Sequence, residues 1–111
     1  MGMRFVAGSS QYLSRGALAT AAPLTLAARV RLASLGTARS FMSLGVNDGS
    51  GNNRFNIQSN STNTVSAITR TTASAAASSA GTVSLGKWHH VIGVFHSATS
   101  RFVWLDGVES A

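Results

Sequence analysis

Cysteine is absent from this chain and acidic residues are scarce, and each shortage removes a class of function. Without cysteine the chain can form neither a disulfide framework nor a thiolate metal site, and its redox compartment cannot be inferred. Its three acids, Asp48, Asp106 and Glu109, stand against nine Lys and Arg, giving a formal net charge of +6. No apolar run reaches the roughly 18 residues of a membrane span. None follows Met1 as in a signal peptide, so we expect neither membrane association nor a general secretory route.

Short apolar runs separated by turn residues fill most of the sequence. Few long charged side chains and many small or β-branched ones favour strands over helices. With 111 residues the chain fits one domain, which we assign to residues 1–111. Closely spaced strands with turn signals between them predict an all-β sandwich or barrel. We expect strands at residues 3–7, 11–14, 24–34, 40–46, 54–59, 63–70, 81–85, 88–96 and 101–105, with a return from Val108 after an Asp106-Gly107 turn.

Alternation within these runs predicts which residues share a face. In the run 24–34, Leu26, Ala28, Val30 and Leu32 alternate with Thr25, Ala27, Arg29 and Arg31, as in a half-buried strand. The run 40–46 places Phe41 opposite Leu44. The run 88–96 is apolar on both faces, which predicts a central strand packed on two sides, with Trp88 in the core. The same alternation assigns Trp104 to the core, and residues 71–80 are interpreted as a flexible loop or a plain edge strand.

Several segments together resemble the LamG-like, concanavalin A-like family. They are Val83–Phe95 and Arg101–Val108, supported near the front by Met3–Phe5, Gln11–Leu13 and Leu24–Val30. The resemblance covers nearly the whole chain and implies an antiparallel jelly-roll β-sandwich. Family domains usually continue for several strands after the Asp-Gly hairpin, so we expect an abbreviated or truncated jelly roll. An incomplete sheet has unpaired edges that can add a strand, which predicts an oligomer or a larger assembly.

The sequence offers little for catalysis. Glycosidases of related folds need two carboxylates flanking the bond, and only Asp106 and Glu109 lie near each other in the chain. Asp106 is already explained by its turn, and there is no Gly-x-Ser-x-Gly elbow for a nucleophilic serine. We therefore predict that the protein is not an enzyme.

Metal and ligand binding have few candidate residues. His89 and His90 would point to opposite faces of a strand, and His90 and His96 would lie about 20 Å apart along it. We interpret His89 or His90 as a hydrogen-bonded structural residue beside Trp88, and we predict no cofactor. Calcium at Asp48 stays open. The candidate ligand-binding loop comprises Asn47, Asp48, Asn52 and Asn53.

The positive charge is dispersed. Eight arginines occur singly, with no basic cluster and no interleaved aromatic platform, so no nucleic-acid partner is predicted. Arg29 and Arg31 share one strand face. That face is either a solvated surface or a docking surface for an acidic protein, and both readings stay open.

Two hypotheses on function follow, and both depend on the resemblance. The first is a bacteriophage structural protein: a capsid decoration or cementing subunit, or a tail component, assembled in the host cytoplasm. Its partners would be its own copies, the major capsid protein or another virion protein. The alternative is a carbohydrate- or cell-surface-binding module of a larger protein, with loops 47–53 and 71–80 as candidate rims of the glycan site. A purely intracellular interaction domain is a third reading.

Overall fold

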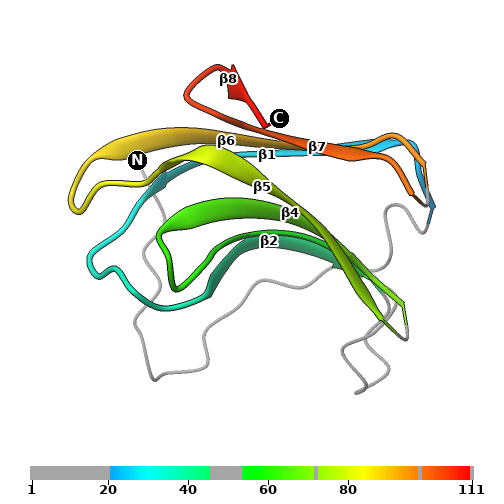
Figure 1. The fold of residues 1–111 in the computed structure, drawn as a ribbon, viewed down its shortest axis with the longest axis horizontal. Coiled ribbons are helices and arrows are strands. Elements are labelled where there is room, and N and C mark those ends of the chain that lie inside the picture. Colours follow the sequence, from blue (N-terminus) through cyan, green and yellow to red (C-terminus); the bar gives the residue numbers. More distant parts are fainter. Residues whose placement is uncertain (1–20, 46–53, 72, 98, 111) are drawn as a thin grey trace.

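Two facing antiparallel sheets make up the computed structural model, which describes residues 21–45, 54–71, 73–97 and 99–110 (Figure 1). One sheet has the order β1-β6-β7-β8 and the other β2-β3-β4-β5. The predicted all-β sandwich is confirmed, while the strands expected at 3–7 and 11–14 lie outside the described residues. The strands are β1 Leu24–Arg31, β2 Arg39–Gly45, β3 Arg54–Ser59, β4 Thr64–Arg70, β5 Ser74–Thr82, β6 Trp88–Phe95, β7 Arg101–Leu105 and β8 Val108–Glu109.

The core lies between the sheets and is built from one face of each. Gly93 marks the closest approach, because a Cβ there would lie 2.5 Å from Ile57 Cγ2 and 3.2 Å from Ala67 Cβ. Beside it, the rings of Phe55 and Phe95 pack edge to face with centroids 5.1 Å apart. The buried apolar residues are Leu26, Leu32, Ile57, Val65, Ala67, Val83, Val91, Phe95, Val103 and Leu105.

Several strand predictions are confirmed. β1 buries Leu26 and leaves Arg29 and Arg31 exposed, as its alternation predicts, although it ends three residues before the predicted Ser34. β5 is the outermost strand of its sheet among the described residues, which agrees with the plain edge strand expected within 71–80. Asp106 and Gly107 have φ values of 52° and 86°, so they form the left-handed two-residue turn that their sequence predicts.

Two predictions about faces are wrong. In β2 a register shift between Ser40 and Met42 inserts one extra residue, so Phe41 and Leu44 both pack against the core rather than on opposite faces. β6 was expected to be packed on two sides, but its sheet covers the core with one face only. As a consequence Trp88, predicted to be core, is 54% exposed, and Trp104 is half-buried.

The outer face of the second sheet is polar. Ile57 and Ala67 point into the core, so the alternate positions on β3 and β4 point away from it. We call this the amide face and define it by Asn56, Gln58, Asn60, Ser66 and Ser78. Hydrogen bonds link its members: Asn56 Nδ2 donates to Gln58 Oε1 (2.8 Å), Gln58 Nε2 to Asn60 Oδ1 (3.4 Å), Asn60 Nδ2 to Ser66 Oγ (2.7 Å), and Ser66 Oγ lies 2.8 Å from Ser78 Oγ.

Candidate functional site

The outer face of the first sheet carries aromatic and apolar side chains in cross-strand rows. Opposed residues of antiparallel strands point to the same side of a sheet. One row joins Thr25, Val94 and Phe102, and the next joins Ala27, Ile92 and Trp104. Two further pairs, Arg29 with His90 and Arg31 with Trp88, extend the face toward the end of β1. We call the whole surface the tryptophan face; it comprises Thr25, Ala27, Arg29, Arg31, Trp88, His90, Ile92, Val94, Phe102 and Trp104.

Much of the tryptophan face is apolar and accessible. Trp88 is 54% and Phe102 38% exposed, while Ile92, Val94 and Trp104 are half-buried. The rings of Phe102 and Trp104 have centroids 6.1 Å apart, so they form a joined aromatic pair. Contiguous exposed apolar side chains of this kind make the tryptophan face a candidate contact surface.

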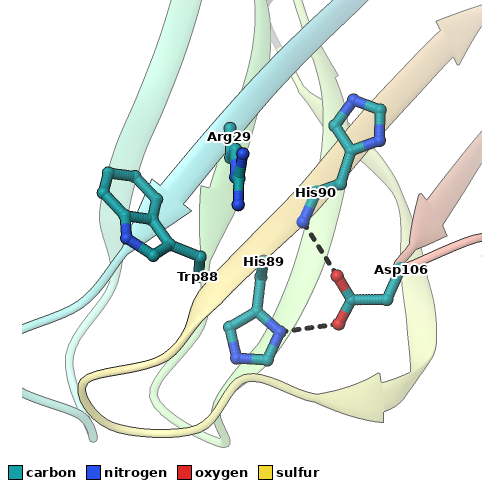
Figure 2. A pocket seen from close by; sticks show the side chains of 5 residues that line it. All are labelled: Arg29, Trp88, His89, His90 and Asp106. Atoms are coloured by element: carbon teal, nitrogen blue, oxygen red, sulfur yellow. Dashed lines mark hydrogen bonds and ion pairs between the residues drawn. The ribbon is translucent and has the colours of Figure 1, made fainter. Parts of the chain in front are cut away.

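Arginine borders this patch at one end. The Arg29 guanidinium carbon lies 5.5 Å from the centroid of the Trp88 ring, a cation–π arrangement that holds the charge beside the indole. Figure 2 shows the two side chains next to each other, with His90 farther along β6. These residues line a shallow pocket of about 480 Å³ together with His89 and Asp106.

A hydrogen-bonded clamp forms the wall of that pocket. Asp106 Oδ2 accepts a bond of 2.6 Å from His89 Nδ1, and its Oδ1 accepts one of 2.8 Å from the His90 backbone N–H. The Asp106 N–H donates in return to the His90 carbonyl at 2.9 Å. The Ser84 N–H donates to His89 Nε2 at 2.9 Å, so the ring proton sits on Nδ1. The clamp therefore ties the β7–β8 turn and the loop before β6 to the start of β6.

The clamp also fixes the charge of Asp106. The backbone N–H of His90, and after it the His89 side chain, hold the pKa of the Asp106 carboxyl below its usual value of 3.8. Both hydrogen bonds favour the ionised form, and they outweigh the opposing effect of burial. An ionised carboxylate whose two oxygens already accept hydrogen bonds suits a structural bond better than proton transfer.

The structure places the sequence-predicted residues in different ways. Arg29 and Arg31 lie on the exposed side of β1, and Arg29 contacts Trp88. The candidate loop residues, Asn47, Asp48, Asn52 and Asn53, lie outside the described residues. His89 is the hydrogen-bonded structural histidine, 8% exposed, whereas His90 is on the open face.

Within ranges 21–45, 54–71, 73–97 and 99–110, no three His, Asp or Glu side chains gather as metal ligands. The same ranges contain no helix able to cross a membrane.

The sequence analysis missed the pocket and its clamp. Trp88 was assigned to the core because the run 88–96 is apolar on both faces. The alternation did contain the missing signal, since it places His89 on the face of the buried Val91 and Trp88 on the opposite one. A buried histidine at that position needs a partner, and the chain has only three acids to supply a carboxylate.

Fold and surface together define a two-sheet antiparallel sandwich that exposes aromatic side chains on the outer face of one sheet. Residues 7–111 match the family model of the concanavalin A-like lectin/glucanases superfamily, and the chain belongs to that family. Domains of this kind often bind carbohydrate or protein. No curated protein and no solved structure matches the chain.

Proposed function

We propose that this domain is a non-enzymatic docking module that binds another protein through the tryptophan face. The observation that carries the proposal is the solvent-exposed row of aromatic side chains, with Trp88 and Phe102 both more than a third exposed. Tryptophan and arginine are the residues most enriched among those that dominate binding energy at protein interfaces, and here they are adjacent. The partner presents an apolar surface of matching shape.

The charge of the domain restricts what that partner can be. With a net charge of +6 and arginines bordering the patch, a second copy placed face to face would set like charges against each other. An acidic partner is attracted instead. Docking is therefore to a protein of the opposite charge rather than to a second tryptophan face.

For the identity of that partner we propose a bacteriophage particle. In this role the domain is a capsid decoration or cementing subunit, assembled in the host cytoplasm, that stabilises the shell through protein contacts. The support is the jelly-roll architecture, the docking face and the basic charge, which complements an acidic shell. A tail protein is the other virion partner that fits the same chemistry.

Site-specific cross-linking tests the docking proposal. A photocrosslinking amino acid in place of Phe102 is expected to capture one defined acidic virion protein in producing cells, identified by mass spectrometry. The same amino acid in place of Met42, which is 39% exposed on the other sheet, is the matched control and is expected to capture nothing specific. Trp88→Ser should abolish the cross-link at 102. Equal capture from both positions, or no capture from 102, contradicts the proposal.

A second function is favoured by the pocket itself. An exposed indole beside the polar groups of Arg29, His90 and Asp106 is an arrangement on which a sugar ring can stack while its hydroxyls form hydrogen bonds. In that case the domain is a carbohydrate- or cell-surface-binding module. A glycan array followed by titration separates the two functions. Saturable sugar binding lost in Trp88→Ala but retained in Phe102→Ala assigns the pocket to a glycan.

A further inference from the structure

The Arg29 side chain is held in place by an aromatic ring and not by an acid. Its guanidinium lies 5.5 Å from the Trp88 ring centroid, and no carboxylate of the described residues pairs with it. A guanidinium has five N–H donors, and a cation–π contact with an indole supplies no oxygen acceptor for them. The ring contact therefore holds the charge beside the indole, and no hydrogen-bond acceptor for these donors is found among the described residues.

The nearest acid in the pocket is already occupied. Asp106 lines the same pocket as Arg29, but its two oxygens accept from the His89 ring and the His90 backbone. The acid thus serves the clamp, and in the part of the chain that the structure describes the Arg29 cation beside it has no acidic partner. Arg31, on the same exposed side of β1, adds a second positive charge. Two cations and one committed carboxylate leave this end of the face with an excess of positive charge.

The surroundings specify the shape of a missing partner. His90 is the cross-strand neighbour of Arg29, so its exposed ring stands on the same face. The apolar rows of Ile92 with Trp104 and Val94 with Phe102 begin directly beyond it. A ligand that covers both the pocket and the apolar cross-strand rows needs one acidic group to enter the pocket. It also needs apolar groups on either side of that acid to contact the rows.

We propose that the pocket is a carboxylate subsite: the docked partner inserts an Asp or Glu side chain beside Trp88, where its oxygens accept from the Arg29 guanidinium. The inference rests on the proposed docking function and names the partner group that the face recognises. A bidentate arginine–carboxylate pair fixes orientation as well as affinity, so this contact sets the register of docking over the apolar rows.

Two short peptides test the subsite. They are acetyl-Leu-Glu-Leu-amide and its neutral counterpart acetyl-Leu-Gln-Leu-amide, titrated against the full chain while the Trp88 Nε1–H and Arg29 Nε–H resonances are followed by NMR. The acidic peptide is expected to bind about tenfold more tightly, the discrimination of one charge-assisted hydrogen-bonded contact at a partly exposed position. Its preference should shrink as salt is raised, because exposed charges are screened.

Arginine variants on the same strand serve as the matched controls. Arg29→Lys keeps the charge but lacks the planar fork, and it should lose most of the preference for the acidic peptide. Arg31→Lys should keep that preference. Equal affinity for the two peptides, or equal loss in both variants, overturns the carboxylate subsite. If both peptides bind equally and still shift Trp88, the docking face stands without the subsite; if neither binds and no cross-link forms at 102, the docking face fails as well.

Discussion

The outer faces of the two sheets have the same strand geometry but carry opposite kinds of side chain. The amide face is polar, its side chains form hydrogen bonds with one another, and Asn56 and Ser66 are only 1% and 2% exposed. The tryptophan face is largely apolar and exposed, and its Arg29 contacts the Trp88 ring and pairs with no carboxylate of the described residues. Hydrogen bonds within the amide face contribute to stability, although the buried Asn56 Oδ1 has no partner among the described residues. The exposed aromatic surface of the tryptophan face is what the proposed docking partner would cover.

The largest expected effect separates the core from the tryptophan face. Phe95→Ala should lower the free energy of unfolding by about 3–5 kcal/mol, because Phe95 is fully buried at the point where the sheets meet. Trp88→Ala removes a larger side chain and should cost less than about 1 kcal/mol, since most of that ring already contacts water. Urea unfolding of both variants measures the difference. A loss at Trp88 equal to that at Phe95 would mean that the outer face is structural.

A smaller effect should distinguish the two outer faces directly. Asn56→Ala removes the donor to Gln58 Oε1 from a buried position and should cost about 1–3 kcal/mol. The matched change on the other sheet is His90→Ala, again an outward-facing polar residue of an inner strand. Its ring is exposed, so the expected change lies within about 0.5 kcal/mol. Thermal unfolding of the two variants measures these changes. Similar losses of unfolding free energy in both would contradict the difference between the two outer faces.

The smallest effect concerns the clamp at the edge of the tryptophan face. The pKa of Asp106 is lowered in the folded chain, so its contribution to stability is present above the usual value of 3.8 and is lost as pH falls through the folded pKa. The stability difference between the wild-type chain and Asp106→Asn should therefore shrink as the pH falls below about 4. Asparagine tolerates the left-handed turn that residue 106 adopts, so the variant isolates the charge. Urea unfolding across this range, with Glu109→Gln as control, provides the measurement.

The strands could be predicted from sequence more reliably than the surface they expose. β3 and β7 begin and end at the predicted residues, because alternation and flanking turn residues agree there. The extra residue in β2 left no trace in the pattern, and it moved Phe41 to the core side. Alternation tells which residues share a face, as with Trp88 and His90, but not whether a second layer covers that face.

The pocket needed three-dimensional information for a related reason. His89 and Asp106 are 17 positions apart, and only the pairing of β6 with β7 brings the turn beside the histidine. Arg29 was named from its strand face alone, either as part of a solvated surface or as a candidate docking residue. Its contact with Trp88 depends on the antiparallel register of β1 and β6, which alternation does not determine. Residues on a shared face were therefore predictable, and their partners across strands were not.

The clamp has a consequence for the thermodynamics of the proposed docking. Four hydrogen bonds join the β7–β8 turn, the loop at Ser84 and the first residues of β6, so these three segments are ordered before any partner arrives. A recognition wall that is already rigid loses little conformational entropy when it is covered. The free energy of contacts with this wall is then offset by little ordering cost on binding. The free and the occupied pocket should have nearly the same shape.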